Sequence, residues 1–364
     1  MRYQHGVTVV LAVVSIATLS GCAAPVAVHT NAPVVAAPSA TPTPTPAEAG
    51  PTVRVPTTCD ALVPHAAADA AAGVSVVAAK PERSANPVSY ADDREGALTC
   101  RWSSDPARSY LETTNVYVTI VPDVTTSAFD DERHGIGVGG EDRQAAYGAD
   151  SYSFCNFMGW ATSCVFRELV NGYGVAGSVA RAGNTVDSRT DAAMATLFSS
   201  VNSAVSAFAP PSALWEPSAG SINGASTCNQ LATPAQITTV FPIEGPHEAK
   251  GEGGEDAIST LGAAQLVDSY YCILTATSGT FSLELAVLPG GALYVDTAER
   301  ARVASGGAPG QVVTGVGDRA LYDQKTGTLD VVAGGGWVQV GDATARLDQL
   351  TAMAKAVLSN LGYH

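Results

Sequence analysis

The chain has few positive charges. It contains 19 Lys and Arg residues against 34 Asp and Glu residues, which gives a formal net charge of −15 at pH 7. A protein this acidic repels phosphate backbones, so the composition argues against nucleic acid as a partner. The sequence also lacks the usual zinc spacings and the hydrolase motifs G-x-S-x-G, S-x-x-K and H-E-x-x-H. We therefore expect no metal, no cofactor and none of the common catalytic templates.

The apolar run near the start is too short for a retained membrane span. Gly6–Leu19 has about 14 residues, and a helix that crosses the hydrocarbon core needs roughly 20. The run follows Arg2 and precedes Ser20-Gly21-Cys22, the layout of a signal peptide closed by a lipobox. We predict a signal peptide at 1–21 and a diacylglycerol on the Cys22 thiol, which anchors the protein to the outer face of the cell membrane.

The segment after Cys22 is rich in Ala, Pro, Thr and Val and has almost no charge. Its centre is the alternating Thr-Pro run at 41–46. Such a composition cannot bury a core, and proline favours an extended backbone. We predict that residues 22–58 form a disordered leash that holds the folded part away from the bilayer.

After the leash the sequence repeats itself. Divergent landmarks recur in the same order, which predicts two tandem similar domains at 59–208 and 227–364. Prolines and small residues mark 209–226 as the linker. The paired landmarks are 58–62 with 227–231, 98–102 with 270–274, 116–122 with 282–289, 137–143 with 315–319, and 171–175 with 335–338.

Helix signals begin and end each copy. Thr233-Pro234-Ala235-Gln236 is a capping box with proline at the first helical position. Apolar residues recur at three- and four-residue steps over 347–361, and 197–208 has the same apolar spacing. Between these helices we expect about four to six strands per copy and a further helix near 296–304. The fold class is therefore α+β, with mostly antiparallel sheets packed by N- and C-terminal helices.

The cysteines predict three disulfides. Seven are present, and setting aside Cys22 leaves six in a compartment that permits disulfides. The repeat selects the pairs Cys59–Cys100 and Cys228–Cys272, because each joins the first helix of a copy to a strand. Cys155 and Cys164 have no counterpart in the second copy, and their spacing suits the two ends of a hairpin.

Few side chains stand out as functional candidates. His65, His134 and His247 lie in the part expected to fold, and each is interpreted as a lone surface residue. The best metal candidate is the loop 244–256, which is rich in carboxylates and glycine. It lacks the D-x-D-x-D-G pattern that places oxygens around calcium, so we interpret it as a solvated acidic loop.

Three other features are interpreted as structural. The glycines of 135–140 resemble a phosphate loop, but no helix start follows them, so we predict a turn. The Asp-Arg pair found in both copies predicts an ion pair of Arg143 or Arg319 with a nearby carboxylate. Tyr173 and Trp337 follow glycine at matching places, and we expect both rings to fill the core.

The lipobox at Cys22, the Thr/Pro leash, the T-C-x-x-L openings, the G-V-G-D-R segment and the closing amphipathic helix together resemble actinobacterial cell-envelope lipoproteins of a domain-of-unknown-function type. The resemblance implies an α+β sandwich outside the membrane, and some members of that group assist envelope proteins or bind lipids. We expect a tethered binding or adaptor module whose partner is an envelope protein, a lipid or a glycan. The alternatives are an extracytoplasmic hydrolase that uses carboxylates such as Asp142 and Asp318, and a passive envelope component.

Overall fold

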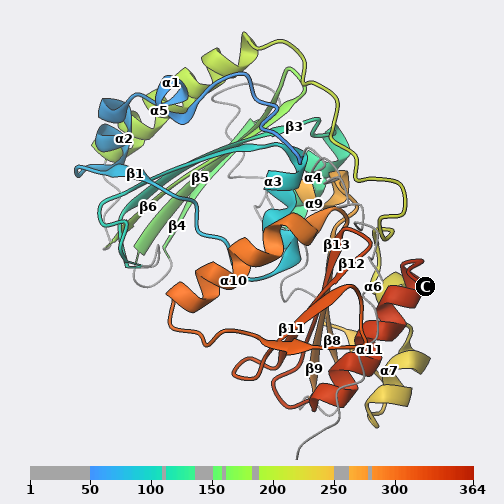
Figure 1. Ribbon diagram of the computed structural model, residues 1–364. Coiled ribbons are helices and arrows are strands. Elements are labelled where there is room, and N and C mark those ends of the chain that lie inside the picture. Colours follow the sequence, from blue (N-terminus) through green and yellow to red (C-terminus); the bar gives the residue numbers. More distant parts are fainter. Residues whose placement is uncertain are drawn as a thin grey trace, which may run out of the picture. The chain divides into compact units, whose positions relative to one another are not determined.

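The structure is a computed structural model that describes residues 50–108, 112–135, 151–157, 161–182, 188–249, 262–277 and 281–364. The predictions for the signal peptide, for Cys22 and for most of the leash fall on residues 1–49, outside the described residues. Residues 49–364 form one compact unit that contains two antiparallel sheets (Figure 1). We refer to residues 50–208 as the first half and to residues 209–364 as the second half.

The first half contains sheet A, which is built from strands β1 to β6. Its elements in chain order are α1 (Cys59–Leu62), α2 (His65–Ala72), β1 (Val77–Ala79), η1 (Pro87–Tyr90), α3 (Ala91–Glu95), β2 (Leu98–Ser103), β3 (Asn115–Pro122), α4 (Thr126–Gly135), β4 (Ser151–Phe157), β5 (Ala161–Val170), β6 (Tyr173–Ala182) and α5 (Ser188–Ser206).

The second half contains sheet B, which is built from strands β7 to β13. Its elements in chain order are α6 (Cys228–Leu231), α7 (Pro234–Val240), β7 (His247–Glu248), α9 (Ala263–Leu266), β8 (Tyr270–Thr275), β9 (Ser282–Leu288), η2 (Gly291–Tyr294), α10 (Val295–Ala304), β10 (Gln311–Val313), β11 (Arg319–Asp323), β12 (Thr328–Ala333), β13 (Gly336–Gly341) and α11 (Leu347–Asn360).

The two sheets share one strand order. Sheet A runs β1-β2-β3-β6-β5-β4, and sheet B runs β7-β8-β9-β13-β12-β11-β10 when it is read from β7. The first six positions therefore correspond one to one, and β10 is an addition at the free edge of sheet B. This shared order confirms the predicted α+β class with two similar halves. The seventh strand of sheet B was not expected.

Each sheet buries one face under a pair of helices. In the first half α2 and α5 cover sheet A, and in the second half α7 and α11 cover sheet B (Figure 1). The predicted capping box is present, because Thr233 Oγ1 accepts from Gln236 N at 3.3 Å and Gln236 Oε1 accepts from Thr233 N at 2.9 Å. Most of the predicted stripe of α11 is buried as well, with Leu350, Ala354 and Val357 fully inside the core.

All three predicted disulfides are formed. Cys59–Cys100 joins α1 to β2, and Cys228–Cys272 joins α6 to β8, at sequence separations of 41 and 44. Loops of this length correspond to about 4 kcal/mol each in the chain-entropy account of crosslinking. Cys155 and Cys164 lie directly opposite each other in the hairpin of β4 and β5, as their spacing predicted.

The structure differs from the predictions at the segment boundaries. The leash was expected to extend to Thr58, but Arg54 and Val55 are buried, because Arg54 pairs with the buried Glu95 of α3. The linker was expected to end at 226, but Ile222 and Ala225 already belong to the core beneath sheet B. The repeated G-V-G landmark at 137–143 lies outside the described residues, and the strand at the position of β11 in sheet A is β4.

Glu168 in the first half is a buried carboxylate with no ion-pair partner among the described residues. Glu168 of β5 is 4% exposed and receives a hydrogen bond from Asn202 of α5. Its Oε2 atom has no hydrogen-bond partner among the described residues. Burial raises the pKa of Glu168 to about 7, although the bond from Asn202 acts in the opposite direction.

We expect Glu168→Gln to raise the free energy of unfolding by about 1–3 kcal/mol at pH 8. At pH 4.5 the substitution should change the free energy of unfolding little. The pKa of Glu168 is higher in the folded state than in the unfolded state. In acid the carboxyl group is protonated and does not destabilise the fold, whereas its ionisation lowers the stability increasingly as the pH rises to about 7. Urea unfolding at both pH values measures the difference. Glu112→Gln removes an exposed carboxylate of the same half and should show no such pH dependence. An equal effect of Glu168→Gln at both pH values would contradict the prediction.

Candidate functional site

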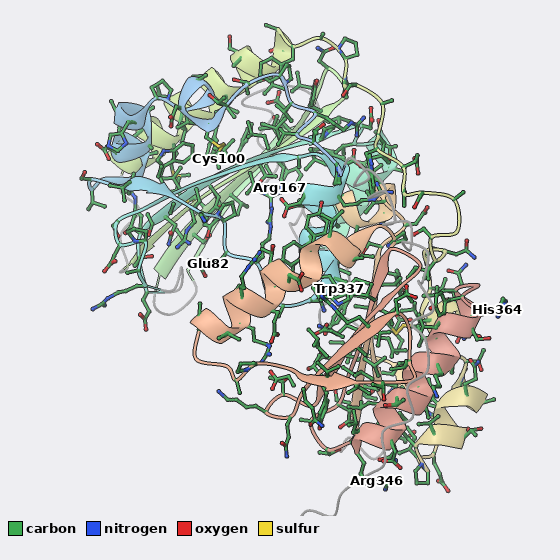
Figure 2. All side chains as sticks on the ribbon, in the orientation of Figure 1. Glu82, Cys100, Arg167, Trp337, Arg346 and His364 are labelled. Carbon is green, nitrogen blue, oxygen red and sulfur yellow. A yellow bond between two sulfur atoms is a disulfide. The ribbon has the colours of Figure 1, made fainter. Side chains whose placement is uncertain are left out.

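Sheet B has a second face, opposite to α7 and α11, that is divided into an apolar end and a polar end. Along β13 the side chains alternate, so Val338 and Val340 face the helices and Trp337 and Gln339 face the other way. At the apolar end, α10 and η2 pack on this face, and Trp337 is fully buried beside α10 (Figure 2). Beyond the last turn of α10 the face is polar.

A cavity of about 570 Å³ lies on the polar end of this face. We call it the polar cavity. Residues 84–86 of the first half line one side, and Arg302 of α10 lines another. Part of its sheet side is a cross-strand row, in which Glu284, Gly341, Thr328 and Asp323 are successive partners on β9, β13, β12 and β11. Asp330 and Gln339, which are partners in the next row, line the cavity as well. The cavity therefore depends on both halves of the chain.

Asp330 is at the centre of the hydrogen bonds beside the polar cavity. Its Oδ1 accepts from Trp337 Nε1 at 2.9 Å and from Gln339 Nε2 at 2.8 Å. The same Gln339 Nε2 donates to the Ala85 carbonyl at 2.5 Å, so this amide joins sheet B to the first half. Burial raises the pKa of Asp330 to about 6, although the two donated bonds act in the opposite direction.

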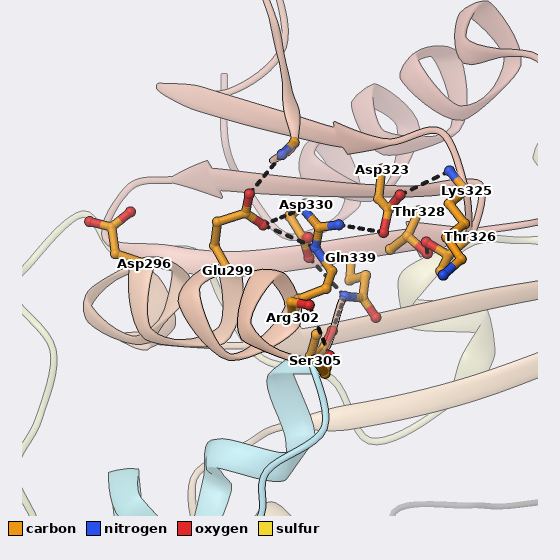
Figure 3. Close-up of polar contacts among 12 residues, drawn as sticks. Asp296, Glu299, Arg302, Ser305, Asp323, Lys325, Thr326, Thr328, Asp330 and Gln339 are labelled. Atoms are coloured by element: carbon orange, nitrogen blue, oxygen red, sulfur yellow. Dashed lines mark hydrogen bonds and ion pairs between the residues drawn. The ribbon is translucent and has the colours of Figure 1, made fainter. Parts of the chain in front are cut away.

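Arg302, which lines the polar cavity, is already bound to carboxylates. Figure 3 shows Arg302 between Glu299 of the same helix and Asp323 of β11, at 2.6 and 2.7 Å. Burial opposes the ionisation of Asp323, but the N–H of Lys325 and the charge of Arg302 outweigh it and lower its pKa. Arg302 thus fixes the end of α10 to the sheet.

Two further carboxylates line the polar cavity. Glu284 is exposed and shares a hydrogen bond with Tyr271, whose pKa is raised by burial and by this carboxylate. Asp342 is 5% exposed, and its Oδ1 accepts from the N–H and the hydroxyl of Thr344, both at 2.7 Å. With the hydroxyls of Ser84, Ser282 and Thr328, this lining offers many hydrogen-bond acceptors and no described histidine, cysteine or lysine.

Several predicted residues have the structural roles that the sequence indicated. Tyr173 and Trp337 are both fully buried, which confirms them as core residues. Arg319 pairs with Asp296 at 2.7 Å, which confirms the predicted ion pair for the second copy. Asp318 accepts hydrogen bonds from Gly334 N and from the Tyr363 hydroxyl, both at 2.8 Å.

Other predictions concern groups that the structure describes only in part. Asp142, Arg143 and the glycines of 136–140 lie outside the described residues, as do the side chain of His134 and residues 250–261 of the acidic loop. The hydrolase alternative therefore stays a prediction. His65 is exposed and lies 3.6 Å from Asp69, and His247 is exposed on β7. Within the described ranges, no three potential ligands are close enough to hold a metal ion.

The sequence analysis did not single out the polar cavity. Its one signal was the polar residues Asp330 and Gln339 inside otherwise apolar strands. Comparison with known proteins adds no assignment, because no family model, no curated protein and no solved structure matches the chain. Among the helices of the described ranges, none has the length and apolar character needed to cross a bilayer.

Proposed function

We propose that the protein is a lipid-anchored, extracytoplasmic binding module that takes a small polar ligand into the polar cavity. The signal peptide and the lipid on Cys22 place it on the outer face of the cell membrane, and the leash gives it reach. The observation that carries the proposal is the cavity itself, whose volume of about 570 Å³ lies in the range of small-molecule sites.

The lining of the polar cavity supports binding more than catalysis. Asp323 and the Oδ1 atom of Asp330 hold the local structure together through Arg302, Trp337 and Gln339. The remaining polar groups are acceptors and hydroxyls of the kind that orient a hydrophilic molecule. Because Gln339 and residues 84–86 belong to different halves, a bound ligand would also hold the two halves together.

Filling the cavity tests this proposal. A Cβ atom on Gly341 would lie 3.6 Å from Glu284 Cβ and Thr328 Oγ1, which is ordinary contact, so a larger side chain there must extend into the cavity. We expect at least one of glucose, citrate, glucosamine and spermidine to raise the Tm of the full-length protein in detergent. Gly341→Leu should abolish that rise, and Gly341→Ala should keep it. A wild-type protein that responds to none of them, or a Gly341→Leu variant that responds normally, would contradict the proposal.

The anchor is tested separately from the cavity. We expect the wild-type protein to partition into the detergent phase and Cys22→Ala to lose this behaviour, because two acyl chains are needed for stable anchoring. Recovery of Cys22→Ala in the detergent phase would contradict the lipid anchor and would leave the cavity proposal unaffected.

A further inference from the structure

We propose that the ligand of the polar cavity carries at least one primary ammonium group, which pairs with a carboxylate of the set Glu284, Asp330 and Asp342. This inference rests on the proposed function, since it names the chemical class of ligand for the same cavity. The charge of the lining, the spacing of the strands that carry the carboxylates and the hydroxyls around them support it.

Of the four carboxylates that line the polar cavity, Asp323 is paired with Arg302, and the other three differ from it. Among the described residues, Glu284, Asp330 and Asp342 form no ion pair within 4.0 Å. Arg302 is close enough to influence Asp330 through its charge, but its donors are bound to Glu299 and Asp323. Asp342 is buried and Asp330 is half-buried, whereas Glu284 is exposed. Carboxylates that lie away from water are normally paired with a cation. A positively charged ligand would supply the missing partner.

The spacing of these carboxylates favours an organic cation over a metal ion. Glu284 is on β9 and Asp330 is on β12, and β13 lies between these two strands. Neighbouring strands are about 4.8 Å apart, so the two backbones are separated by roughly 10 Å. Within the parts of the chain that the structure describes, these carboxylates do not form a group of three potential ligands close enough to hold a metal ion. A molecule several bonds long can instead place an ammonium at one carboxylate and further polar groups along the row.

Two kinds of small molecule share this ammonium chemistry. An amino sugar would also use the hydroxyls of Ser282 and Thr328 and the amide of Asn86, all of which line the cavity. An aliphatic polyamine would use the carboxylates alone and would reach from one to the next. The experiment separates these two kinds of ligand. Glucosamine has an ammonium and hydroxyls, spermidine has ammonium groups without hydroxyls, and glucose has hydroxyls without an ammonium.

The test is calorimetric titration of the detergent-solubilised, full-length protein with glucosamine, spermidine, glucose and citrate. We expect an amine to bind at least about tenfold more tightly than glucose, because a hydrogen bond to a charged group contributes about 1.5–3 kcal/mol. Glu284→Gln and Asp330→Asn should each weaken amine binding several-fold. Asp348→Asn removes an exposed carboxylate of α11, on the opposite side of sheet B, and should bind like the wild type.

The outcomes separate this inference from the proposed function. Tighter binding of glucosamine than of spermidine would assign an amino sugar, and the reverse order a polyamine. If glucose or citrate binds in the cavity as tightly as the amines, the ammonium inference is overturned and the binding site stands. If amine binding persists unchanged in Gly341→Leu or in both carboxylate variants, the amines bind elsewhere and the inference is overturned. If no compound binds, both proposals are overturned.

Discussion

Replacing Trp337 by alanine is expected to lower the free energy of unfolding by about 3–5 kcal/mol. The indole is fully buried, and its neighbours come from both halves of the chain, because Tyr90 of η1 packs against it with ring centroids 5.7 Å apart. The substitution would leave a large void and would remove the donor that Trp337 Nε1 provides to Asp330. Urea unfolding of the purified protein measures the loss.

A matched variant separates burial from residue type. Trp215 is partly exposed and lies over the guanidinium of Arg94, with 5.1 Å between the Arg94 Cζ atom and the ring centroid. Trp215→Ala should lower the free energy of unfolding much less than Trp337→Ala does. Trp337→Phe should fall between the two, because it keeps a buried aromatic ring but loses part of the buried volume and the indole donor. A Trp337→Ala variant no less stable than Trp215→Ala would show that the shared core around Trp337 does not join the halves.

The features that the sequence predicted correctly all depend on local or repeated signals. The capping box at Thr233 is contained in four adjacent residues. The disulfides Cys59–Cys100 and Cys228–Cys272 followed from two copies of one pattern, and the matching strand orders now account for that pattern. Trp337 was expected to be buried because its place after glycine matches that of Tyr173 in the first copy.

The features that the sequence did not predict come from contacts between distant segments. Gln339 and Ala85 are 254 positions apart, and nothing in either segment indicates that an amide of one binds a carbonyl of the other. The polar cavity is formed by these same segments. Arg54 was assigned to the leash because its neighbours are prolines, threonines and valines, whereas its position is decided by a carboxylate 41 residues away.

The contact between the halves follows the symmetry of the repeat. Helices α3 and α9 occupy equivalent places, each directly before the second strand of its sheet, and they pack against each other. Ala91 of α3 and Ala264 of α9 share one buried cluster. Small side chains allow this close approach. The repeat thus explains both the common fold of the halves and the way in which they meet.

Arg54 binds groups from three separate segments of the chain near the contact between the halves. Its Nη1 donates to Glu95 Oε1 at 2.5 Å, its Nη2 binds Asp123, and its Nε donates to the Ser212 carbonyl at 2.8 Å. Arg54 and Glu95 are both buried, and burial raises the pKa of Glu95 to about 7 even though the charge of Arg54 lowers it. One side chain therefore connects the end of the leash, α3 and the segment between the halves.

We expect Arg54→Met to cost about 3–5 kcal/mol at pH 8, because it leaves the Glu95 carboxylate buried without its cation. The loss should shrink at pH 5. The pKa of Glu95 is higher in the folded state than in the unfolded state. In acid the protonated carboxyl group needs no cation, and the free energy of unfolding falls as the pH rises through about 7 because the buried group ionises. Urea unfolding of the variant at pH 5 and pH 8 measures both effects.

Two further variants decide whether the instability of Arg54→Met comes from the lost charge or from the changed shape of the side chain. Arg54→Met combined with Glu95→Gln removes both charges and should recover most of the stability at pH 8, since an uncharged pair of similar size carries no desolvation cost of this kind. Arg346→Met breaks an exposed pair with Asp348 and should change stability little at either pH. If the double variant is as unstable as Arg54→Met, the arginine acts by filling space and not by neutralising Glu95.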